Sequence, residues 1–86
     1  MQIDAAVVKE QGVTFAVVVV KRSVLQSPAR RGEAVDSFRP LFPGLPLVLM
    51  AQDSRGVPSY DGRQDIVKFL ANIDHRRIPW KRYTVS

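Results

Sequence analysis

The chain has 86 residues, a formal net charge of +5 and no cysteine, and hydrophobic residues make up 45% of it. A chain of this length predicts a single domain over residues 1–86. Without cysteine the chain has no disulfides and no thiolate metal site, and thiol–disulfide exchange is excluded as an activity. The longest apolar run, residues 15–20, is too short to cross a bilayer, and no signal peptide is recognisable. We therefore expect a cytoplasmic protein without membrane contact.

Two apolar segments near the start of the chain predict an antiparallel hairpin. Residues 3–8 and 13–20 are rich in valine and other strand formers, and the polar residues 9–12 between them end in a glycine. The second segment is apolar almost throughout. We therefore expect it to be a central strand that is covered on both faces.

A helix is predicted to follow, starting at Ser27-Pro28. A hydroxyl residue before a proline is a typical start, because the side chain caps the helix and proline suits its first position. Pro40 should end or kink the helix near residues 37–39. The apolar face comprises Ala34, Val35, Phe38, Leu41 and Phe42.

The rest of the chain predicts two more strands and a second helix. Residues 45–51 form an apolar strand that should run parallel to the central strand, because a helix connects the two. After a turn at residues 53–56, the short strand 57–60 should lie at a sheet edge, since Pro58 cannot donate to a ladder. Asp61 and Gln64 have the spacing of a capping box. The helix they would start buries Ile66, Val67, Phe69, Leu70 and Ile73 and should end at residues 74–77, where cations lie near the C-terminal end of the helix dipole.

These elements predict a small α/β domain with a mixed sheet, in the order β-β-α-β-β-α. Residues 80–85 could add a last strand or form an ordered tail, and the sequence leaves both open. Self-association through an exposed edge, at residues 3–8 or 80–85, also stays open, as does the oligomeric state.

Two segments resemble the thioredoxin-fold family. Gly44-Leu45-Pro46, with the strands and helix after it, resembles the second half of that fold, where a cis proline faces the active site. Residues 26–30 open a helix after an apolar strand and are similar to the family's Cys-Gly-Pro-Cys-Lys segment. The resemblance covers residues 14–74, although the interval from Pro28 to Pro46 is too short for the strand–helix unit of a full thioredoxin. It implies a minimal scaffold whose redox chemistry is absent, because Gln26 and Ala29 replace the two cysteines.

The sequence contains no recognisable catalytic or cofactor site. The carboxylates are scattered, and the pair Glu33 and Asp36 is best explained as part of a solvated helix face. The only histidine, His75, is expected at the solvated end of the last helix and has no partners at metal-ligand spacing. We therefore expect no metal, no cofactor and no enzymatic activity.

The basic C-terminal segment, residues 75–86, carries the sharpest functional signal, because cations alternate with aromatic residues there. Three interpretations stay open. The first is an edge strand whose charges lie in water. The second is a surface for a protein partner, where tryptophan, tyrosine and arginine are common. The third is a nucleic-acid surface on which bases stack. The candidate residues are Arg76, Arg77, Trp80, Lys81, Arg82 and Tyr83.

Arg30 and Arg31 form a possible second patch. They fall in the first turn of a helix, where cations oppose the helix dipole, and this placement favours a role such as pairing with an acidic partner. The sequence as a whole predicts a non-redox, thioredoxin-like interaction module that binds a protein partner. The alternative is a nucleic-acid-binding module that uses the basic C-terminal segment.

Overall fold

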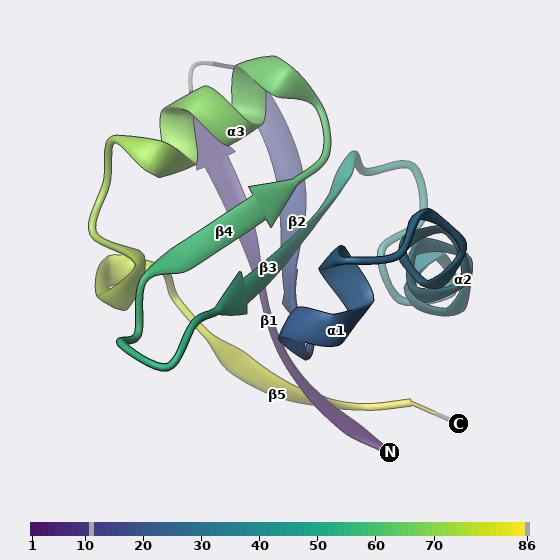
Figure 1. Cartoon of the computed structure of the whole chain (residues 1–86). Helices are drawn as coiled ribbons and strands as arrows, with labels where there is room; N and C mark the ends of the chain where they lie inside the picture. Colours follow the sequence, from purple (N-terminus) through teal and green to yellow (C-terminus); the bar gives the residue numbers. More distant parts are fainter. Residues whose placement is uncertain (11, 86) are drawn as a thin grey trace.

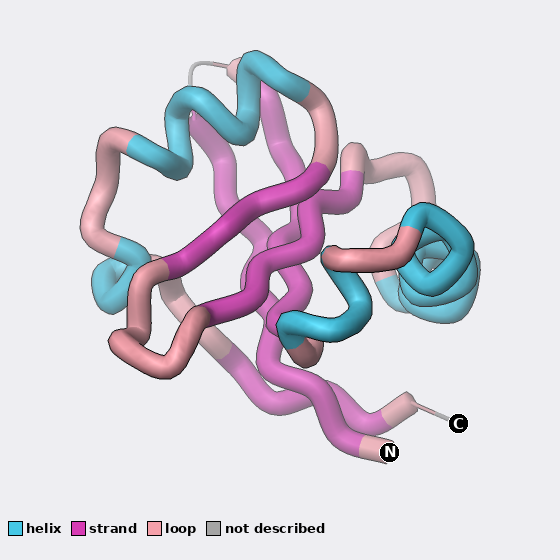
Figure 2. The backbone as a smooth tube through the Cα atoms, in the orientation of Figure 1, coloured by secondary structure: helices cyan, strands magenta, loops and turns pink. Residues whose placement is uncertain are grey.

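The computed structural model describes residues 1–10 and 12–85 and contains a mixed five-stranded sheet with helices on both faces (Figures 1 and 2). The strands lie in the order β4-β3-β2-β1-β5. Their bounds are β1 Gln2–Glu10, β2 Val13–Val19, β3 Leu47–Gln52, β4 Pro58–Asp61 and β5 Lys81–Thr84. The helices are α1 Arg22–Leu25, α2 Pro28–Phe38 and α3 Gln64–Ala71, with short 3-10 turns η1 Arg39–Leu41 and η2 His75–Arg77. The predicted α/β class is confirmed.

β2 is the central strand, as its uninterrupted apolar sequence predicts. It pairs antiparallel with β1 and parallel with β3, and β4 forms one edge of the sheet. The open question at residues 80–85 resolves as a strand, because β5 pairs antiparallel with β1 from Gln2↔Thr84 to Ala5↔Lys81. This pairing places the two ends of the chain side by side (Figure 2).

The core lies on both faces of the sheet. α3 and η2 cover one face, and α1 and α2 cover the other (Figure 1). The buried residues of the first face are Ala6, Phe15, Val17, Val48, Met50, Ile66, Leu70 and Ile78. Those of the second face are Ile3, Ala5, Ala16, Val18, Phe38, Phe42 and Leu49. Alternate residues of β2 belong to alternate faces, and this explains why the strand is apolar throughout.

α2 begins as predicted. The Ser27 hydroxyl accepts a hydrogen bond from the backbone N–H of Arg30 at 3.3 Å, and Pro28 occupies the first helical position. The helix ends at Phe38 and continues as η1, which contains Pro40. α1 was not predicted, because four residues are too few to show a helical period.

Both predicted ends of the last helix are wrong. Asp61 belongs to β4, and the N-cap position of α3 is Arg63, whose side chain makes no capping hydrogen bond. Arg63 instead pairs with Asp65 at 2.7 Å. At the other end, α3 stops at Ala71, and residues 74–77 start a separate turn because the Asp74 side chain caps η2 through the backbone N–H of Arg76.

Among the described residues every peptide bond is trans, including Leu45–Pro46, so the cis proline of the family that this segment resembles is not reproduced here. The Pro46 carbonyl accepts a hydrogen bond from the backbone N–H of Ala16 at 2.9 Å, which aligns the chain for the start of β3 at Leu47. No helix in the described part of the chain has the length and apolar character needed to cross a membrane.

Candidate binding surfaces around the C-terminal strand

The two aromatic residues of the basic C-terminal segment lie on opposite faces of the sheet. Tyr83 packs on the α2 side, where its ring meets Phe42 edge to face with centroids 5.2 Å apart. Trp80 packs on the α3 side, and its indole N–H donates to the carbonyl oxygen of His75 at 3.0 Å. Both rings are half-buried. The segment therefore does not present its aromatic residues as one stacking platform.

Two of the four cations in this segment are engaged within the chain. The guanidinium of Arg76 forms two hydrogen bonds to Asp74, at 2.9 and 3.1 Å, and this pairing lowers the pKa of Asp74 to about 2. Arg82 pairs with Asp4 across the β5–β1 ladder at 3.2 Å. Arg77 and Lys81 are exposed and form no ion pair within residues 1–10 and 12–85.

An open cleft of about 560 Å³ lies beside β5, at the ends of β2 and β3. Strand pairing brings four of its lining residues together, because Arg82 lies opposite Asp4 and Val19 lies opposite Met50. The other lining residues are Gln52, His75, Trp80 and Lys81. Ligands of α/β proteins commonly bind at the carboxyl ends of parallel strands, which is where this cleft is placed.

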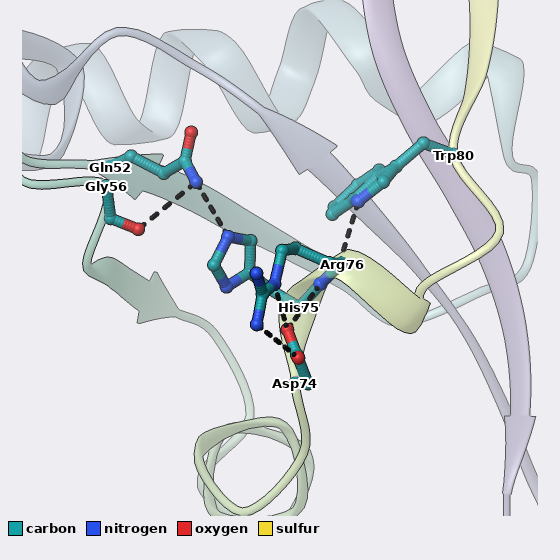
Figure 3. A network of polar contacts seen from close by, with 6 residues as sticks. All are labelled: Gln52, Gly56, Asp74, His75, Arg76 and Trp80. Atoms are coloured by element: carbon teal, nitrogen blue, oxygen red, sulfur yellow. Dashed lines mark hydrogen bonds and ion pairs between the residues drawn. The ribbon is translucent and has the colours of Figure 1, made fainter.

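His75 lies in the wall of this cleft, at the start of η2 and not at the end of α3 (Figure 3). The side-chain amide nitrogen of Gln52 lies 2.8 Å from the Nε2 atom of His75 and also donates to the Gly56 carbonyl at 3.2 Å. An amide nitrogen can only donate, so Nε2 of His75 is the acceptor in this contact. His75 is half-buried and held by Gln52, whereas the sequence predicted a solvated residue.

The sequence did not indicate Asp4 or Gln52 as residues that line the cleft. These two residues are far apart in the chain, and only strand pairing brings their strands together. The hydroxyl of Tyr60 is buried without a hydrogen-bond partner among the described residues. Burial and the nearby charge of Asp74 raise the pKa of Tyr60 above its ordinary value of 10.0.

The possible second patch, Arg30 and Arg31, divides into two different environments. Arg31 is half-buried, donates to the Leu25 carbonyl at 2.7 Å and lies 3.6 Å from the carboxylate of Asp61. Arg30 is exposed. Arg31 therefore already has an acidic partner within the chain, and it joins the α1–α2 turn to β4.

In the described part of the chain, no group of three or more histidine or acidic side chains could hold a metal ion. The comparisons with known proteins found no family model, no curated protein and no solved structure that matches this chain.

Proposed function

We propose that this chain is a non-enzymatic interaction module that binds an acidic segment of a protein partner at the cleft beside β5. The observation that carries the proposal is that Lys81, an exposed cation, and the aromatic residue Trp80 both line this cleft. An aromatic wall with a neighbouring cation is typical of the anchor regions of protein interfaces.

The charge around the cleft favours an acidic occupant. Asp4 is the one carboxylate among the lining residues that the structure describes, and it is paired with Arg82, so no carboxylate of the cleft neutralises Lys81. The outer edge of β5 adds backbone groups that an extended segment could use, as in recognition by strand addition. The net charge of +5 would attract the same class of partner over a longer range.

The nucleic-acid alternative receives less support from the same residues. Nonspecific single-strand binding uses successive aromatic rings along one groove. Trp80 and Tyr83 lie on opposite faces, and the Trp80 indole is tied to His75. The thioredoxin-like relationship over residues 14–74 stays a prediction, and so does the cytoplasmic location, which the lack of cysteine favours.

The test is a titration of the isotope-labelled chain with a glutamate-rich peptide, followed by two-dimensional NMR. We expect the largest shifts at the Trp80 indole and the amides of Lys81 and Arg82. Lys81→Glu should weaken binding by about tenfold, since it replaces attraction by repulsion. Lys68→Glu, the same change at an exposed site on α3 that does not line the cleft, is the matched control.

Two results would contradict the proposal. One is an equal loss of affinity in both variants, which would mean that only net charge matters. The other is salt-sensitive binding of a single-stranded oligonucleotide that is tighter than binding of the peptide and is lost in Lys81→Glu, which would favour the nucleic-acid alternative.

A further inference from the structure

His75 is the only histidine of the chain, and it lines the cleft beside β5. Histidine is the side chain whose charge ordinarily changes between pH 5 and 8. The residue is held at two points, because the Gln52 amide contacts its Nε2 atom and the Trp80 indole donates to its backbone carbonyl (Figure 3). A change of charge on this ring therefore takes place at a defined position in the cleft.

The orientation of the Gln52 amide follows from its second contact. The same side-chain nitrogen lies 2.8 Å from Nε2 of His75 and 3.2 Å from the carbonyl oxygen of Gly56. A carbonyl oxygen only accepts hydrogen bonds, so the atom that faces Gly56 has to be the amide nitrogen and not the amide oxygen. Nε2 of His75 accepts from that nitrogen only while it carries no proton of its own. The contact is therefore incompatible with the doubly protonated ring.

Protonation of His75 brings two hydrogen-bond donors together. Both ring nitrogens of an imidazolium carry hydrogen, so the Nε2–H of His75 then faces the N–H of Gln52. If the amide moves away, this Nε2–H is free to donate into the cleft. If the amide instead turns over and offers its oxygen to the ring, that oxygen faces the Gly56 carbonyl, which loses its donor. In both cases the link from η2 through Gln52 to the β3–β4 turn changes.

The carboxylates on the elements that contact His75 or line the cleft with it are already engaged. The charged residues on these elements are Asp4 in β1, Lys81 and Arg82 in β5, Asp74, Arg76 and Arg77 in and next to η2, and Asp53 and Arg55 in the β3–β4 turn. Asp4 pairs with Arg82, and Asp74 pairs with Arg76. Asp53 accepts hydrogen bonds from the backbone N–H groups of Arg55 and Val57. A proton on His75 therefore adds a positive charge that none of these three carboxylates is free to offset.

We propose that His75 makes the cleft beside β5 sensitive to pH, so that protonation releases the ring from Gln52 and strengthens the binding of an acidic segment. This inference names a regulation of the function proposed above and rests on it. The imidazolium joins Lys81 as a second lining cation without a carboxylate partner in the described residues. Glutamate side chains of the occupant stay largely ionised above about pH 5. Since the protonated form binds more tightly, affinity rises as the pH falls from 8 to 5.5.

The first test measures the affinity of the full chain for the glutamate-rich peptide at pH 8 and pH 5.5, at constant ionic strength. We expect binding to be about threefold tighter at pH 5.5, which is the effect of one added, partly exposed ion pair. His75→Gln keeps a polar side chain that cannot titrate, so its affinity should be the same at both pH values. An α-amino group also titrates near pH 8, but it is present in both chains and its effect cancels.

The second test needs no peptide. Two-dimensional NMR of the free chain follows the His75 ring, the Gln52 side-chain amide and the backbone of Gly56 over the same pH range. We expect the Gln52 and Gly56 signals to move with the same midpoint as the ring, because one amide nitrogen contacts both groups. Gln52→Ala is the matched control, and its Gly56 signals should no longer follow the ring.

The two tests distinguish a failure of the pH switch from a failure of the proposed function. Binding of equal strength at the two pH values, or a pH dependence that persists in His75→Gln, would overturn the switch and leave the proposed function intact. No binding at either pH would contradict the proposed function. The free chain would then decide about the switch alone, and Gln52 and Gly56 signals that ignore the titration of His75 would overturn it.

Discussion

The indole N–H of Trp80 donates to the carbonyl oxygen of His75 across 3.0 Å, and this bond joins η2 to the start of β5. The backbone N–H of Trp80 also donates to the Ile78 carbonyl at 2.8 Å, and the Ile78 side chain is buried. These contacts fold residues 75–80 into a tight connection that directs β5 along β1. Trp80 thus has a structural role in addition to the role proposed for it in the cleft.

Substitutions at Trp80 separate its hydrogen bond from its packing. Trp80→Phe should lower the free energy of unfolding by about 1 kcal/mol, because it removes one hydrogen bond but keeps an aromatic ring. Trp80→Ala should lower it by about 3 kcal/mol, because the ring also leaves the core cluster under α3. Urea unfolding followed by circular dichroism measures both values. Equal losses in the two variants would show that the ring contributes no packing.

The contact of Tyr83 with Phe42 should anchor β5 to the opposite face. Tyr83→Ala should cost about 2 kcal/mol of stability, since the ring is half-buried and makes an edge-to-face contact. Tyr83→Phe is the matched control and should change stability by less than about 0.5 kcal/mol, because it keeps the aromatic contact. Hydrogen exchange of the β1 and β5 amides gives a local readout. Faster exchange only in the alanine variant is the expected result, and unchanged exchange in both would contradict the anchoring role.

Much of the fold could be predicted from local sequence. The apolar run of β2, the Ser27-Pro28 helix start and the edge position of Pro58 each depend on a few adjacent residues with a clear physical preference. The ends of α3 were predicted wrongly, because Asp61 satisfies a capping pattern but is used by β4. Asp61 pairs with Leu49 in the sheet, and α3 therefore starts further along the chain, with Arg63 at its N-cap position.

The candidate sites were less accessible to sequence reasoning. The cleft depends on Asp4 and Gln52 lying near Trp80, and these neighbours arise from the pairing of β5 with β1. This feature has no local pattern. The alternation of cations and aromatics in residues 75–86 did not reveal that its two aromatics face opposite sides of the sheet.

The same substitution should have opposite effects at two glycines. A Cβ atom at Gly62 would lie 2.9 Å from the Val48 side chain and 3.3 Å from the Leu47 carbonyl oxygen, so Gly62→Ala should destabilise the fold by about 2 kcal/mol. Gly32 lies inside α2 with nothing within 4 Å of the added atom. Gly32→Ala should therefore stabilise it by about 0.5–1 kcal/mol through helix propensity. Thermal unfolding of the two variants checks both signs, and a shift of the same sign in both would contradict the packing at Gly62.

Stability in acid should depend on Asp74. Its pKa falls from 3.8 to about 2 because the side chain and the backbone N–H of Arg76 donate hydrogen bonds to the carboxylate. A carboxyl group whose pKa is lower in the folded state stabilises that state above its unfolded pKa, and this contribution is lost as the pH falls from about 4 through about 2. Asp74→Asn keeps a side chain that can cap η2 but cannot titrate, so it should flatten the decline of stability over this range.

Urea unfolding at a series of pH values measures the effect of Asp74→Asn. Asp65 offers a second, independent site, because Arg63 lowers its pKa to about 2 as well. The two carboxylates share no partner within the described residues, so the flattening in Asp65→Asn and in Asp74→Asn should add in the double variant. NMR titration of the side-chain carboxyl carbons assigns each pKa directly. An ordinary pKa for Asp74 in that titration, or an acid transition that Asp74→Asn leaves unchanged, would show that the Arg76 pair does not persist in solution.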